Sequence, residues 1–166
     1  MKAEAVDRGS ETVIDPATEA VLQEVVRRES RSLLSYIGDA YPWTTAEASR
    51  ELGALGKLVR EEGSAVAALG QYLVRKGGEP PFLGSYPAAF TSCNFISLGY
   101  LVPRLVETQR RSIAELEADV GKVPDPPSCQ QLERLLAVKK KTLAGLEALA
   151  ASPAEAAPTA PEPWPS

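Results

Sequence analysis

Apolar residues recur at three- and four-residue spacing along four stretches of the chain, and this period is that of an amphipathic α-helix. The first stretch begins at Asp15-Pro16, where an N-cap residue precedes a proline at the first helical position. Pro42 disfavours helical backbone at Tyr41 and ends the stretch, so the pattern predicts a helix over residues 16–40. Its inward positions are Leu22, Val25, Val26, Leu33, Tyr36, Ile37 and Ala40.

The second stretch opens on Thr44-Thr45-Ala46-Glu47, which has the spacing of a capping box. Gly77-Gly78 closes it, and Pro80-Pro81 prevents the helix from continuing. Between the capping box and the glycines, one line of residues faces inward, and one of these residues carries a carboxylate. This line is Leu52, Leu55, Val59, Glu62, Val66, Leu69 and Leu73.

A third helix is predicted over residues 93–121, with Pro103 either kinking it or marking its firm start. Gly121 and Pro124 end it. The later inward positions of this helix are Val102, Val106, Gln109, Ile113, Leu116 and Val120.

A fourth helix is predicted to open at residues 125–128, with Ser128 and Gln131 spaced as a capping box. Its inward line also contains polar side chains, one of them a lysine. The members are Leu132, Leu135, Lys139, Thr142, Leu146 and Leu149.

Four amphipathic helices with short first and last links, and no two-residue period, predict an all-α fold. The longer link over residues 79–92 is enough to run the length of a bundle, so we expect an antiparallel four-helix bundle with a crossover between the second and third helices. The aromatic residues of this link are expected to pack on the bundle. We assign the bundle to residues 15–151 and predict disordered tails over residues 1–14 and 152–166.

Composition narrows the function classes. The net charge is −4, and no basic patch indicates a nucleic-acid partner. No apolar run approaches the ~20 residues of a membrane span, and no apolar segment typical of a signal peptide follows Met1. We therefore expect a cytoplasmic protein that binds neither nucleic acid nor membrane.

The chain has no histidine, which removes the usual general base and the commonest metal ligand. Its two cysteines, Cys93 and Cys129, lie near the starts of two antiparallel helices and so at opposite ends of the bundle. A disulfide requires Cα atoms within about 7 Å. We therefore expect two free thiols and a reducing compartment.

Three inward positions carry charged side chains, namely Glu29, Glu62 and Lys139. A lone buried charge is very costly, so these groups need partners. We expect a buried Glu29–Lys139–Glu62 cluster with Tyr36 and Thr142 as hydrogen-bond partners. Its net charge of −1 requires either one protonated carboxylate or a further donor. The alternative interpretation places these residues on solvated helix faces.

The spacing of these residues resembles that of ferritin-like di-iron proteins such as bacterioferritins and rubrerythrins. Glu29 and Glu62 are 33 residues apart, and Glu62-Gly63-Ser64-Ala65 stands where that family has Glu-x-x-His. Tyr36 resembles a tyrosine near the family's metals. The same step in the second half pairs Val106 with Lys139, and Thr142 takes the second histidine position.

The departures from this pattern matter for function. Two of the six implied ligand positions keep a carboxylate, and Lys139 would supply the positive charge that iron supplies in the family. The resemblance thus implies a ferritin-like bundle without a functional di-iron centre, with no cofactor and no catalytic residues. The vestigial positions are Glu29, Glu62, Ala65, Val106, Lys139 and Thr142.

Two other functions stay open at this point. One is a ferroxidase or peroxide scavenger that holds iron or manganese with Glu29, Glu62 and Glu107. The other is a small-molecule site in the bundle core, where Ala65 and Val106 leave space.

Glycines recur every seven residues at Gly56, Gly63 and Gly70, with Gly53 nearby. Such a stripe permits a close helix approach, either within the bundle or across a dimer interface. We expect a homo-oligomer, a dimer or larger, with no protein partner identifiable.

Overall fold

The computed structural model describes residues 13–40, 42, 46, 48–94 and 96–152, and these are all-α. They form five α-helices and one 3-10 helix, with no β-strand among them. None of these helices is both long enough and apolar enough to cross a membrane. The elements are α1 (Pro16–Ser30), α2 (Leu33–Ala40), α3 (Ser49–Arg75), η1 (Ala88–Cys93), α4 (Leu98–Val120) and α5 (Pro126–Ala150).

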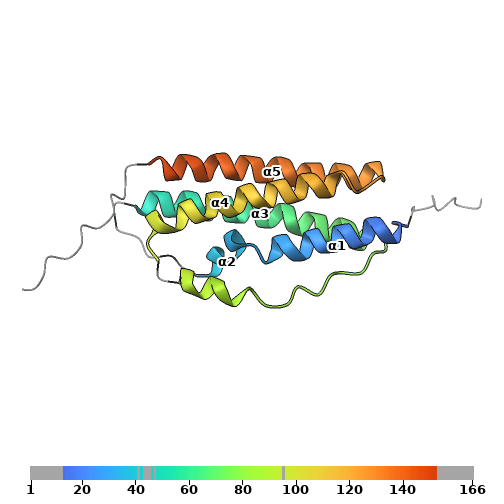
Figure 1. Ribbon diagram of the computed structural model, residues 1–166, viewed down its shortest axis with the longest axis horizontal. Helices are drawn as coiled ribbons and strands as arrows, with labels where there is room; N and C mark the ends of the chain where they lie inside the picture. Colours follow the sequence, from blue (N-terminus) through green and yellow to red (C-terminus); the bar gives the residue numbers. More distant parts are fainter. Residues whose placement is uncertain (1–12, 41, 43–45, 47, 95, 153–166) are drawn as a thin grey trace, which may run out of the picture.

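Helices α3, α4 and α5 extend along the long axis of the molecule, as does α1, and the shorter, inclined α2 follows α1 (Figure 1). Helix α5 packs against α3 and α4, while α1 and α2 pack against α3 and, less extensively, α4. The crossover after α3 runs outside α1 and α2 to η1 (Figure 1). Hydrogen bonds fix both ends of this path, from Gln23 to the Glu79 carbonyl and between Ser35 and Tyr86.

The helix predicted over residues 16–40 is interrupted, and this prediction was wrong in that respect. The backbone N–H groups of Arg31 and Ser32 donate three residues back, to the carbonyls of Arg28 and Glu29. Ser32 then caps α2, because its hydroxyl accepts from the backbone N–H of Ser35 at 3.2 Å. The apolar period continues across the break, so periodicity alone could not reveal it.

The helix termini correct two further predictions. Asp125 caps α5 by accepting from the backbone N–H of Ser128 at 2.9 Å, so the capping box expected at Ser128 is wrong. The Ser128 hydroxyl is instead buried and bonds that of Tyr72 at 3.0 Å. Helix α4 begins at Leu98, five residues later than expected, and contains Pro103 on its exposed side. Thr44, Thr45 and Glu47 of the other expected capping box lie outside the described residues.

The start of α1 and the end of α3 follow the sequence signals. Asp15 accepts from the backbone N–H groups of Ala17 and Thr18, both at 3.0 Å. Gly77 has φ +80°, and Gly78 donates to the Leu73 carbonyl at 3.0 Å, closing α3. A Cβ on Gly78 would lie 2.5 Å from Leu73 Cδ1, so glycine is needed there for packing as well.

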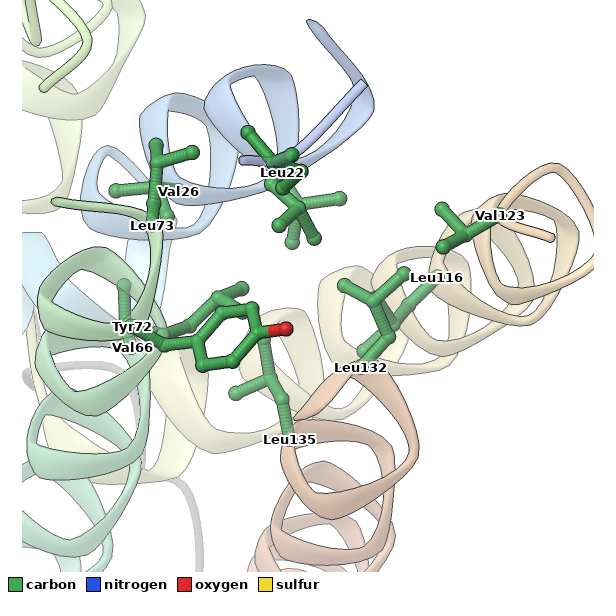
Figure 2. Packing of buried hydrophobic residues seen from close by; sticks show 12 residues of the cluster. Leu22, Val26, Val66, Tyr72, Leu73, Leu116, Val123, Leu132 and Leu135 are labelled. Carbon is green, nitrogen blue, oxygen red and sulfur yellow. The ribbon is translucent and has the colours of Figure 1, made fainter. Parts of the chain in front are cut away.

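Two apolar clusters form the core, one toward each end of the molecule. The first cluster gathers side chains from α1, α3, α4 and α5 around Leu22, Leu73 and Leu116 (Figure 2). The second lies around Leu34, Leu101 and Leu146. Polar residues separate the two clusters along each long helix, and they define the candidate site.

The edges of the domain differ partly from the prediction. Ile14, which we expected in a disordered tail, joins the first cluster, and its backbone N–H lies 3.4 Å from the Lys76 carbonyl. Residues 1–12 and 153–166 lie outside the described part of the chain.

In the crossover, Tyr86 and Phe90 pack on the Tyr36 ring, but Phe82 is 89% exposed. Cys93 and Cys129 are both free thiols, which confirms that prediction.

Candidate functional site

A layer of polar side chains crosses the interior between the two apolar clusters. Glu29 occupies the last turn of α1, Glu62 the middle of α3, and Lys139 the middle of α5. Helix α4 adds Gln109 and Ser112 at the same level. Helices α3, α4 and α5 place apolar residues on either side of this layer, and α1 and α2 flank it from its two sides. Its position therefore follows from the interruption of the apolar lines.

Lys139 lies at the centre of the layer. Its Nζ donates to Glu29 Oε2 at 2.8 Å and to Glu62 Oε1 at 2.7 Å. The three side chains are 0%, 1% and 4% exposed respectively. The structure thus brings together the three charged residues that the sequence places on inward lines, and they are not on solvated faces.

Donors from α4 satisfy the remaining carboxylate oxygens. The Gln109 amide donates to Glu62 Oε2 at 2.6 Å and to the Lys139 carbonyl at 3.2 Å. The Ser112 hydroxyl lies 2.9 and 2.8 Å from the two oxygens of Glu29. Buried charges are tolerated when they are both paired and hydrogen-bonded, and both conditions hold here.

Arg28 extends the layer toward the surface. Its Nε lies 3.0 Å from Glu29 Oε1 and 3.2 Å from Glu115 Oε2, and its second nitrogen donates to Asp119 at 2.9 Å. Burial acts to lower the pKa of Arg28, but the hydrogen bond with Asp119 and the charge of Glu29 outweigh it, so this pKa is raised. Lys122 also pairs with Asp119, at 2.7 Å. Arg28 is therefore the further donor that the net charge of the Glu29–Lys139–Glu62 cluster requires.

Tyr36 and Thr142 do not play the predicted part. The Tyr36 hydroxyl donates to Asn94 Oδ1 at 2.6 Å, and its ring packs in the second apolar cluster. The break at residues 31–32 puts Tyr36 in a separate helix from Glu29, which is why their shared seven-residue spacing misled. Thr142 is buried on α5, but among the described residues it makes no hydrogen bond to the three charged side chains.

The other vestigial positions are also displaced from the layer. Ala65 packs against the first apolar cluster and Val106 belongs to the second. On α4 the layer is reached three residues after Val106, at Gln109. Glu107 is exposed and pairs with Arg111 at 3.5 Å, so it is not a third carboxylate for the pair Glu29 and Glu62.

Sequence reasoning missed Arg28, Ser112 and Asp119, and gave Gln109 no role. Gln109 carried a readable signal, because it is a polar residue on an otherwise apolar line of its helix. Arg28 and Ser112 lie off the inward lines, and reach the cluster through side-chain length and through position at the helix interface. Their roles therefore depend on the packing and not on the local pattern.

The donor set fits an ion cluster better than a metal centre. Among the described residues, no group of three or more His, Cys, Asp or Glu side chains is placed to hold a metal ion. The Lys139 ammonium occupies the point at which Glu29 and Glu62 converge, and it has no lone pair to offer a metal. The residues present therefore do not fit a di-iron centre of the kind that ferritin-like proteins hold.

Comparison of the chain with protein-family models, with curated proteins and with solved structures finds no match in any of the three.

Proposed function

We propose that the chain is a non-catalytic, ferritin-like four-helix bundle in which an internal ion cluster stands in place of a di-iron centre. In this proposal α1 and α2 together form the first of the four helices. The role is structural or binding, and no catalytic residue is assigned. The observation that carries the proposal is the position of Lys139 Nζ, within hydrogen-bond distance of both Glu29 and Glu62.

Electrostatics explains why Lys139 can stand in place of a metal ion. Two carboxylates that converge in an interior need a counter-charge, which either a cation or a basic side chain can supply. Lys139 supplies it from within the chain, and Arg28 balances the second carboxylate. A divalent ion entering between Glu29 and Glu62 would have to displace a buried ammonium and leave it without a partner.

The competing function is a ferroxidase or peroxide scavenger with iron or manganese. Purified protein should be mixed with Fe(II) in air while Fe(III) formation is followed by absorbance. We expect the rate to equal that of buffer with an inert protein. A rate that rises with protein concentration, and that falls in Glu62→Gln, would replace the proposal by the ferroxidase.

The expected homo-oligomer remains part of the proposal. A Cβ on Gly53 or Gly63 would meet no atom within 4 Å, so packing within the chain does not require glycine at these two positions. Light scattering on the protein as it elutes from a size-exclusion column measures its molar mass and tests the homo-oligomer. A mass of two or more chains supports it, and a monomer at micromolar concentration contradicts it.

A further inference from the structure

A groove lies between the α1–α2 break and α3, next to the ion cluster. Its volume is about 360 Å³, which falls in the range of small-molecule sites. Val26, Leu34, Val59 and Val66 give it apolar walls. Glu29 and Glu62 also line it, so the groove joins an apolar body to buried charge.

Two features of the backbone open this groove. The break after Ser30 separates α1 from α2, and both Ser30 and Ser32 lie on its edge. On the opposite side, Gly63 leaves open the space that a side chain would enter, since a Cβ added at this position would meet no atom within 4 Å. Leu83 of the crossover borders the groove from outside and is itself partly exposed.

The charges at the groove select the sign of a ligand. Among the described residues that line the groove, Glu29 and Glu62 carry charge, and none is a lysine or an arginine. A cationic head group would therefore face carboxylates on the groove wall, and an anionic one would face groups of its own sign. Glu62 accepts two hydrogen bonds, from Lys139 and Gln109, whereas a carboxylate has about four acceptor positions.

We propose that this groove binds a small amphipathic primary amine, with its ammonium group at Glu62 and its alkyl chain against Val59 and Val66. The ammonium would face the carboxylates of the groove wall and use acceptor capacity that the cluster leaves free. A carboxylate ligand of the same size would instead face groups of its own charge and is excluded. This inference rests on the proposed function, because a metal between Glu29 and Glu62 would occupy the carboxylates that the amine would bind.

Hexylammonium, hexanol and hexanoate are probes with alkyl chains of matched size and with head groups of different charge. Binding to the full chain should be measured by NMR titration, with contacts read from nuclear Overhauser effects to valine methyls. We expect saturable binding of hexylammonium, with contacts to Val59 and Val66, and binding of the other two that is weaker by about tenfold or more. Equal binding of all three, or no saturable binding of hexylammonium, would overturn the inference.

Two glycine variants locate the site. Gly63→Leu fills the groove at a position with open space, while Gly53→Leu adds the same side chain to equally open space on the same helix but away from the groove. Gly63→Leu should weaken hexylammonium binding at least about tenfold, and Gly53→Leu should leave it unchanged. Wild-type binding by Gly63→Leu would contradict the location. Metal content measured on the same sample separates the two claims. A metal-free protein that does not bind hexylammonium would contradict only the proposed ligand. A metal-loaded protein would contradict the proposed function.

Discussion

Lys139 on α5 and Glu62 on α3 form a buried ion pair, with 2.7 Å between Nζ and Oε1 and side-chain exposures of 0% and 4%. The same Nζ bonds Glu29 on α1, so one ammonium joins three helices at a single level. A buried charge left without its partner is strongly destabilising, whereas an exposed pair contributes little.

Lys139→Met should lower the free energy of unfolding by about 3–5 kcal/mol, because it leaves Glu29 and Glu62 buried with fewer donors. Lys140→Met is the matched control, since Lys140 is the next residue, is half-exposed and pairs with Glu117 at 2.7 Å. The control should change stability by at most about 1 kcal/mol. Equilibrium urea unfolding of both variants measures this, and equal, small effects would mean that the cluster is not an energetic unit.

Arg28→Lys should destabilise the protein although it keeps the charge. The guanidinium reaches Glu29 through Nε and Asp119 through a second nitrogen, and a single ammonium cannot reproduce this two-sided geometry. We expect a loss of about 1–3 kcal/mol in urea unfolding. Arg27→Lys, one residue earlier and exposed, serves as the control. Wild-type stability in Arg28→Lys would show that charge alone suffices at this position.

Glu61 gives a pH-dependent prediction at the surface. The hydrogen bond from Lys141, at 2.8 Å, lowers the pKa of Glu61, and the charges of Lys141 and Lys57 act in the same direction. A folded pKa below the unfolded one means that the pair stabilises the protein above the unfolded pKa, and that this contribution is lost as pH falls through the folded pKa. Carboxyl NMR titration should show the lowered pKa, and Lys141→Met should raise it toward the ordinary value. An unchanged titration in Lys141→Met would contradict the pairing.

The all-α fold follows from the sequence, because four long lines with a helical period leave no other class. The places where the sequence misleads have local causes. At Arg31 and Ser32 a hydroxyl cap competes with continued helix while the apolar period runs on undisturbed. At Ser128, an acidic residue three positions earlier is the better cap, so the serine is free to bond Tyr72.

Some residues of the candidate site can also be identified from the sequence, and others cannot. Glu29, Glu62 and Lys139 can be identified from sequence because a charge on an apolar line has to find a partner in the interior. Arg28 and Ser112 cannot, since their roles depend on how α1 and α4 pack across from each other. Val106 was assigned to the layer by a repeated 33-residue step, and it misses by nearly one helical turn because α4 and α5 do not repeat the offset of α1 and α3.

Metal content tests the central claim most directly. The protein should be produced in culture supplemented with iron and manganese, purified without chelators, and analysed by inductively coupled plasma mass spectrometry. If Lys139 supplies the charge between Glu29 and Glu62, the protein will carry iron and manganese far below one equivalent per chain. One equivalent or more of either metal, lost in Glu62→Gln, would contradict the account.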